Sequence, residues 1–351
     1  MTIRTDWGVT MRILFILKKN NNYGFQTKGL RKSSGLYNST RFIVENLSAR
    51  GIHAHIVEVN DNNDIDREVT AFQATIVVIE ALWVVPEKFT QLKKLHPRVE
   101  WYVHLHSHIP FLASEGIAMD WIHDYAKKDI GIIANSPEAY QALRVILRPK
   151  SISYLPNVYW NEFLPVRCVS DEYDTVNIGC FGAVRPMKNQ LLQALAAIEF
   201  SREIGKKLRF HINDTRVETN GDPVLKNLRQ LFRDEDRAEL VGHSWMEPED
   251  FVVFLHLHID VAMQVSLTET FNVVTADAVT AGVPVVVSKE IKWISSFNRA
   301  EDDSLSDMVH KLHRVYRNSI LVRWNQHLLR DYSKDAQDAW YQFVLGHKSH
   351  C

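Results

Sequence analysis

Two acidic residues, Glu269 and Asp277, lie eight positions apart in a segment whose pattern predicts a helix. Apolar residues recur at helical spacing, Gly282 then ends the helix, and a short β-branched run predicts a buried strand. A helix start presents free backbone N–H groups, so we expect an anion to bind near Thr270, Phe271 and Asn272. An acidic residue beside a phosphate-binding position, with a second acidic residue about two turns further along the helix, suits the binding of a sugar nucleotide. The acids would accept hydroxyl hydrogen bonds while the helix start holds the diphosphate.

A second candidate is the loop from Gly182 to Lys188. It follows a predicted strand over residues 176–181 and precedes a predicted helix, so it lies at the carboxyl end of its strand, where ligands bind in α/β sheets. Arg185 and Lys188 supply positive charge in this loop. Arginine grips a phosphate through two hydrogen bonds, whereas lysine acts as a point charge. The loop therefore predicts contacts with a diphosphate leaving group, the alternative for Lys188 being an ordinary surface lysine.

Three histidines, His104, His106 and His108, alternate along and just beyond a predicted strand over residues 100–106. The alternation would put all three on one face, as in a metal site. However, no Cys or carboxylate set accompanies them at ligand spacing. We therefore predict no bound metal, and structural histidines with satisfied hydrogen bonds are the alternative to a binding role.

Two series of alternating strands and helices would position these candidates. Predicted strands of the first series cover residues 11–18, 55–59, 74–79, 100–106, 131–134 and 153–155. Those of the second cover residues 176–181, 208–212, 239–241, 259–263 and 283–287. This pattern predicts an α/β fold of two Rossmann-like domains facing across a cleft. We place the first domain at residues 1–160, the second at 161–325 and a helical segment at 326–351.

The composition, with 46% hydrophobic and 24% charged residues among 351, is that of a globular protein with a core in each domain. The cysteines lack metal-like or disulfide-like spacing, and no apolar run approaches the roughly 20 residues that span a bilayer. We therefore expect a cytoplasmic protein. Between Asp6 and Glu45 there are seven basic residues and no acid. This segment is either a solvated loop or a site for phosphate or a polyanionic acceptor.

The segment from Glu269 to Asp277 resembles the Glu, seven residues, Glu signature of retaining glycosyltransferases with the two-domain GT-B fold, with Asp in the second position. The loop ending at Lys188 resembles the Arg-to-Lys loop of that family. Ala183 occupies the usual Arg position, so Arg185 would serve from a shifted position. The resemblance covers nearly the whole chain in motif order. It implies that the C-terminal helix returns to the first domain.

The resemblance also implies a role for each motif. The diphosphate would lie on Arg185, Lys188 and the helix start, with no metal or other cofactor required. Glu269 would hold hydroxyls of the donor sugar and Asp277 the ribose. The remaining contacts would come from His106 near the reacting carbon, Gly35 beside the phosphates and acceptor, Gly182 in the phosphate loop, and His243 and Ser244 beside the base.

Retention would proceed by attack of the acceptor hydroxyl on the face that the diphosphate leaves, so no side-chain nucleophile is needed. A sugar-nucleotide epimerase and a non-catalytic sugar-nucleotide-binding protein are the alternatives to a transferase.

The sequence leaves open which molecule accepts the sugar. The strings 80–89 and 109–113 resemble glycosyltransferases of large tailed bacteriophages. Some of these add sugars to hydroxymethylated bases of phage DNA, and such an enzyme would work in the host cytoplasm. A cell-envelope saccharide or a small acceptor is the alternative. The sequence indicates neither the donor base nor the sugar nor the oligomeric state.

Overall fold

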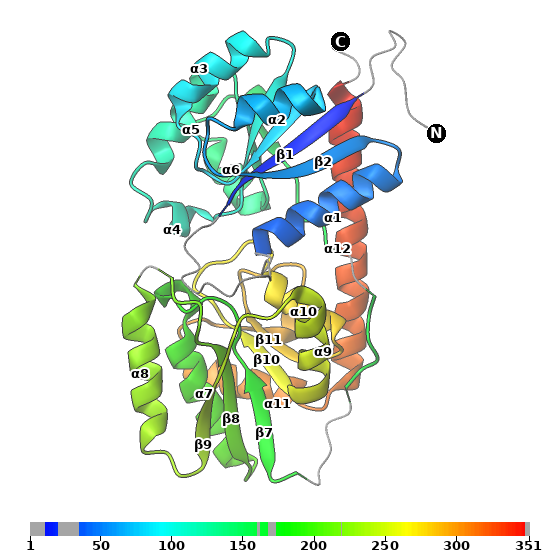
Figure 1. Cartoon of the computed structure of the whole chain (residues 1–351). Coiled ribbons are helices and arrows are strands. Elements are labelled where there is room, and N and C mark those ends of the chain that lie inside the picture. The colour runs from blue at the N-terminus through cyan, green and yellow to red at the C-terminus, as the bar shows by residue number, and fades with distance from the viewer. Residues whose placement is uncertain (1–10, 20–34, 160–161, 168–172, 219, 348–351) are drawn as a thin grey trace. The chain divides into compact units, whose positions relative to one another are not determined.

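The computed structural model describes residues 11–19, 35–159, 162–167, 173–218 and 220–347. These residues form two compact units: one holds residues up to 159 and from Ser333 on, and the other holds residues 162–332. Each unit contains a six-stranded sheet whose strand pairings are parallel. The predicted α/β fold of two Rossmann-like domains is confirmed (Figure 1).

The first sheet has the strand order β2-β1-β3-β4-β5-β6. Its strands are β1 (Arg12–Lys18), β2 (His53–Val59), β3 (Ile76–Glu80), β4 (Glu100–Leu105), β5 (Gly131–Ala134) and β6 (Ile152–Tyr154). The helices of this unit are α1 (Gly35–Ala49), α2 (Ile65–Phe72), α3 (Pro86–Leu95), α4 (Ile109–Leu112), α5 (Ala118–Lys127), α6 (Pro137–Leu143) and the 3-10 turn η1 (Pro149–Ser151). All five residues of β3 are buried, because helices cover the sheet.

The second sheet has the order β12-β11-β10-β7-β8-β9. Its strands are β7 (Thr175–Gly179), β8 (Lys207–Asn213), β9 (Ala238–His243), β10 (Val261–Gln264), β11 (Val285–Ser288) and β12 (Arg299–Ala300). Its helices are η2 (Pro186–Lys188), α7 (Gln190–Glu203), α8 (Gly221–Arg233), α9 (Pro248–His258), α10 (Val273–Thr280), η3 (Ser296–Asn298), α11 (Leu305–Val315) and α12 (Ser319–Gly346).

In both sheets the chain reverses its direction of growth at one place. The first sheet grows outward from β1 to β2 and then resumes at β3 on the other side of β1. The second grows from β7 through β8 to β9 and resumes at β10 on the other side of β7. Ligands of open α/β sheets bind at such switch points, outside the carboxyl ends of the strands. If a ligand binds to either sheet, we therefore expect it at the carboxyl ends of β1 and β3 or at those of β7 and β10.

The long helix α12 contributes to both units, since its residues from Ser333 on belong to the first. There Trp340 is fully buried, its indole contacts the rings of Phe15 and His104, and its Nε1 donates to the carbonyl of Pro156 at 2.9 Å. This part of α12 thereby packs against β1 and against β4, the strand that carries His104.

No helix among the described residues is long and apolar enough to cross a membrane.

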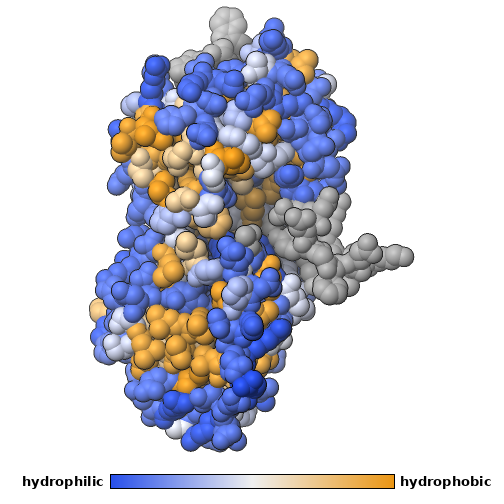
Figure 2. Space-filling model, turned by 90° about the vertical axis from the view of Figure 1, so that its left-hand side faces the viewer, coloured by the Kyte–Doolittle hydropathy of each residue, from blue (hydrophilic) through white to orange (hydrophobic). Residues whose placement is uncertain are grey.

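The face of the molecule in Figure 2 is largely hydrophilic, with apolar side chains gathered on part of the second unit. On that unit, Leu191 and Leu195 of α7 are among the exposed apolar residues.

Candidate functional site

The second unit brings Lys188 and Glu269 together at the switch point of its sheet. Lys188 closes the loop after β7, and Glu269 lies in the loop after β10, the neighbouring strand. The Lys188 Nζ donates to Glu269 Oε1, and only 12% and 10% of the two side chains are exposed. A backbone hydrogen bond from Leu267 to Met187, at 2.9 Å, ties the two loops together. The sequence predicted both residues, and the structure shows that they form one ion pair.

Gly182 sets the path of the loop that carries Lys188. Its φ is +107°, a value that side chains disfavour, and its N–H donates to the Asn213 side chain at 2.9 Å. A Cβ at Gly182 would meet nothing closer than 3.9 Å. The backbone conformation, not a steric clash, therefore requires glycine here.

The helix start beside Glu269 lies further along the chain than predicted. Helix α10 begins at Val273, and Asn272, with φ of 60°, is its N-cap. The Asn272 side-chain oxygen accepts from the Thr275 N–H at 2.8 Å, and its Nδ2 donates to Gln264 at 3.0 Å. The predicted helix start at residues 270–272 is thus corrected to Val273, and an anion site beside this helix start stays a prediction. There the N–H groups of Val273 and Val274 have no acceptor within the helix.

Phe271 is a core residue. It is 1% exposed, its ring stacks on that of Tyr332 at 5.2 Å, and its carbonyl accepts from the Trp293 indole at 2.8 Å. Asp277 is 8% exposed within α10. The predicted contacts of Asp277 with a ribose and of Thr270 with a phosphate stay predictions.

Arg185 has a carboxylate partner that the sequence did not reveal. Its Nη1 donates to Glu218 at 2.9 Å, and Arg216 donates to the other oxygen of Glu218 at 2.8 Å. The Arg216 guanidinium also lies over the ring of Trp245, 4.5 Å from its centre. The shifted arginine therefore belongs to a row of charged and aromatic side chains, and its contact with a diphosphate stays a prediction.

His243 ends β9 and pairs with His211 of β8. Their rings stack at 5.1 Å, and His211 Nδ1 lies 2.8 Å from His243 Nε2. Burial and then the neighbouring His243 lower the pKa of His211 to about 3, and burial also lowers the pKa of His243. Phe254 lies 4.9 Å from the His243 ring. The pair is thus a neutral, aromatic surface; Ser244, directly after it, is partly buried.

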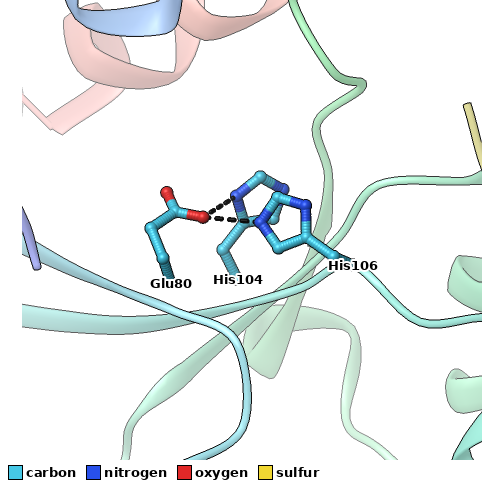
Figure 3. A group of neighbouring side chains, drawn as sticks. All are labelled: Glu80, His104 and His106. Atoms are coloured by element: carbon cyan, nitrogen blue, oxygen red, sulfur yellow. Dashed lines mark hydrogen bonds and ion pairs between the residues drawn. The ribbon is translucent and has the colours of Figure 1, made fainter. Parts of the chain in front are cut away.

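The first unit places Glu80 beside His104 and His106 (Figure 3). Glu80 is the last residue of β3, His104 lies on the adjacent β4, and His106 follows the end of β4. The Glu80 Oε2 accepts from His104 Nδ1 at 3.1 Å and from His106 Nε2 at 2.5 Å. Glu80 and His104 are fully buried, and 16% of the His106 side chain is exposed. The sequence singled out the histidines but missed their carboxylate.

The prediction that no carboxylate accompanies the histidines is wrong. Among the described residues, Glu80, His104 and His106 form the group whose metal-ligating atoms all lie within 4.8 Å of one another. Both nitrogens nevertheless approach the same oxygen, Oε2, at hydrogen-bonding distance. A zinc ion would need all three groups at about 2.0–2.2 Å from a common point, so side chains would have to separate to admit it. The absence of a bound metal stays a prediction.

Two further candidates lie at helix starts. Gly35 is the first residue of α1. No atom of the described residues would lie within 4 Å of a Cβ added at Gly35. His108 is the N-cap residue of α4, although its side chain makes no capping bond. Ser34 and the basic residues Lys28, Arg31 and Lys32 lie outside the described residues.

Comparison with solved structures finds proteins of the same fold. Sucrose-phosphate synthase from Thermosynechococcus elongatus matches with a TM-score of 0.68 at 14% identity, over 96% of this chain and 99% of that chain. HepE from Anabaena, in complex with UDP-glucose, matches with 0.63 at 12% identity, over 97% and 100%. A glycosyltransferase from Rickettsia africae matches with 0.64 at 12% identity, over 97% and 98%. No protein-family model and no curated protein matches the sequence. The similarity establishes the GT-B fold.

Proposed function

We propose that the chain is a glycosyltransferase, which moves a sugar from a nucleotide-diphosphate sugar to an acceptor hydroxyl with retention. The observation that carries the proposal is the Lys188–Glu269 pair at the switch point of the second sheet, directly before α10. A donor offers each member a partner of its own. The diphosphate accepts from Lys188 and from the first turn of α10, and sugar hydroxyls donate to Glu269.

The same groups favour bond breaking. The acceptor oxygen bonds to the anomeric carbon, while the bond from that carbon to the phosphate oxygen breaks and its electron pair stays on the diphosphate. The leaving phosphate takes the acceptor's proton. Negative charge grows on the diphosphate in the transition state, where the fixed charge of Lys188 and the N–H groups of α10 stabilise it most. This reaction needs no metal at the diphosphate.

The stacked rings of His211 and His243 suggest where the base of the donor nucleotide would bind. The neutral, flat rings of His211 on β8 and His243 at the end of β9 suit a base, and Asp277 would supply a carboxylate for the ribose. HepE was solved with UDP-glucose, which makes UDP-sugars the first donors to test.

Donor binding and turnover test the proposal together. We would measure thermal shifts with UDP-, GDP- and ADP-sugars, with and without EDTA, for wild type, Lys188→Ala and Glu269→Gln. A donor at a hundred times its dissociation constant should stabilise the wild type by about 2.7 kcal/mol. Lys188→Ala should reduce kcat by about 10²- to 10³-fold, the usual loss for one group that stabilises transition-state charge.

Lys289→Ala is the matched control, because Lys289 also pairs with a glutamate, Glu301, but on the exposed surface of the same unit. It should behave as wild type. An epimerised donor sugar in place of a transferred one would establish the epimerase, and donor binding without transfer or hydrolysis would establish a binding protein. Inversion at the anomeric carbon, read by NMR of the product, would refute retention.

For the acceptor we propose a hydroxymethylated base in DNA, supported by the acid-free basic segment between Asp6 and Glu45. Replacing Lys28, Arg31 and Lys32 with Ala should weaken DNA binding and reduce its salt dependence. Each phosphate contact releases counterions from the DNA, so a protein that makes fewer contacts releases fewer of them. Unchanged DNA affinity, or transfer to a cell-envelope saccharide or small acceptor alone, would exclude the DNA acceptor. An enzyme of this kind would also have to bring the base out of the duplex.

A further inference from the structure

Two arginines of the second unit hold the same carboxylate. Arg185, in the loop after β7, donates from Nη1 to one oxygen of Glu218 at 2.9 Å. Arg216, in the loop after β8, donates from Nη2 to the other oxygen at 2.8 Å. Since β7 and β8 are neighbouring parallel strands, both loops lie at the carboxyl ends of the strands, where ligands of this fold bind. The two guanidiniums thus form a site that already binds an anion, the carboxylate of Glu218.

The main chain fixes these residues relative to one another. Val184 and Val217 form an isolated parallel bridge between the two loops. The Val184 N–H donates to the carbonyl of Arg216 at 2.9 Å, and the Glu218 N–H donates to the carbonyl of Val184 at 3.1 Å. Gly221 permits this close approach, because a Cβ there would lie 2.1 Å from the carbonyl oxygen of Val184. A change of partner at the site would therefore move side chains and leave the two loops in place.

All three side chains are partly exposed. The exposed fraction is 25% for Arg185, 20% for Arg216 and 32% for Glu218. A carboxylate this exposed loses little when it leaves its arginines, because water replaces their hydrogen bonds. A phosphate group offers more negative charge and more acceptor oxygens, and arginine binds it through two parallel hydrogen bonds. A phosphate group that reaches the two guanidiniums should therefore displace the carboxylate.

We propose that Arg185 and Arg216 together bind a phosphate group of the donor, and that Glu218 competes with this group for the two guanidiniums. The inference rests on the proposed function, which supplies the diphosphate. Lys188 follows Arg185 by three residues and pairs with Glu269 in the same manner, so two cations of one loop each have a carboxylate partner. Glu218 thereby sets the affinity for the donor, because binding exchanges one anion for another.

A purely structural role for Glu218 makes the opposite prediction. If Glu218 served only to tie the two loops together, its removal would leave the arginines less well positioned and would weaken the binding of an anion. If Glu218 competes with the ligand, its removal raises the fraction of the protein whose arginines are available, and the apparent affinity rises with that fraction. The sign of the change in affinity separates the two roles.

Inorganic pyrophosphate is the probe, since it carries the diphosphate without a base or a sugar. Its affinity for the full chain would be measured by isothermal titration calorimetry at low ionic strength, where charge interactions are least screened. Glu218→Gln should bind pyrophosphate about 3- to 20-fold more tightly than the wild type, because each contact of an exposed ion pair shifts an equilibrium by up to about fivefold. Adding Arg216→Gln to this variant should remove most of the gain, because one of the two guanidiniums is then missing.

Glu235→Gln is the matched control. Both oxygens of Glu235 accept from Arg202 at 3.0 Å, and 29% of the Glu235 side chain is exposed, close to the value for Glu218. Arg202 lies in the last turn of α7, and Glu235 lies before the amino end of β9, away from the proposed site. This variant should bind pyrophosphate within about twofold of the wild type. Unchanged or weaker binding in Glu218→Gln, an equal gain in Glu235→Gln, or no binding of pyrophosphate to any of these proteins would overturn the proposal.

The wild type alone supplies a test that does not depend on the folding of any variant. A structure of the wild type with pyrophosphate should show phosphate oxygens accepting from both Arg185 and Arg216, with the Glu218 carboxylate turned away. Pyrophosphate bound while both arginines still donate to Glu218 would overturn the proposal. None of these measurements requires sugar transfer. A chain that gives the expected affinities but transfers no sugar to any acceptor would refute the proposed function and leave the anion site standing.

Discussion

Lowering the pH should destabilise the second unit through His211, and replacing this histidine with glutamine should remove that effect. His211 is 6% exposed on β8, and its two ring nitrogens face His243 and Asn177. Its pKa falls from 6.5 to about 3, chiefly because burial disfavours the charged ring. At pH 5 the folded protein therefore keeps His211 neutral, whereas the unfolded chain protonates it.

The magnitude follows from proton linkage. The folded pKa lies below the unfolded value, so the stabilising contribution is complete above pH 6.5 and is lost as the pH falls toward 3. Within this window the unfolded state binds one more proton, which changes the free energy of unfolding by about 1.4 kcal/mol per pH unit. Between pH 7.5 and pH 5 the loss amounts to about 2 kcal/mol. For a unit of this size it lowers Tm by roughly 4–8 °C.

Scanning calorimetry of the full chain at both pH values checks this reasoning. His211→Gln should lose about 2 kcal/mol less than wild type between pH 7.5 and pH 5. Ile212→Val is the control, because Ile212 is the fully buried neighbour of His211, and the missing methylene should cost about 1 kcal/mol equally at both pH values. Equal losses in wild type and His211→Gln would refute the assignment of a neutral, buried His211.

The remaining predictions concern stability, measured as Tm and denaturation midpoint. Gly182→Ala should cost about 1–3 kcal/mol through backbone strain, because φ is +107° but the added Cβ has room. Gly282→Ala should cost clearly more, since its Cβ would lie 2.1 Å from the carbonyl oxygen of Pro165; equal losses would contradict the distinction. Trp340→Ala should cost about 3–5 kcal/mol as a fully buried aromatic side chain is removed, and a loss below 1 kcal/mol would show that this end of α12 does not pack as described.

Much of the fold could be predicted because buried parallel strands appear as short apolar runs. The limits of β3 show where this rule fails. The apolar run indicated a strand at residues 74–79, whereas β3 continues through Glu80. A carboxylate is rarely buried without partners, and the partners of Glu80 lie 24 and 26 residues away in the sequence. Because only the pairing of β3 with β4 brings them together, sequence spacing could not reveal this group.

The prediction of where α10 begins was wrong for a different reason. Phe271 fits the apolar spacing of the helix, so the periodicity placed it in the first turn. Its burial instead comes from Trp293 and Tyr332, on other segments of the unit. Asparagine is a favoured N-cap residue, so capping preference at Asn272 would have located the helix start correctly. Glu218, the partner of Arg185, lies 33 residues from it and could not be anticipated at all.

The two acidic centres share a feature that stability alone does not explain. Glu269 is almost buried beside Lys188, and Glu80 is fully buried beside two histidines, with one oxygen unpartnered among the described residues. A buried ion pair contributes little net stability, because desolvation offsets the attraction, and apolar side chains of equal volume often serve a core better. Such groups persist where they bind ligands at some cost in stability. Both centres lie at or next to the strand ends where their sheets change direction, the places where the fold itself directs a ligand. Burial cost and topology are independent arguments, and both make Glu80 and Glu269 the first residues to replace in a test of ligand binding.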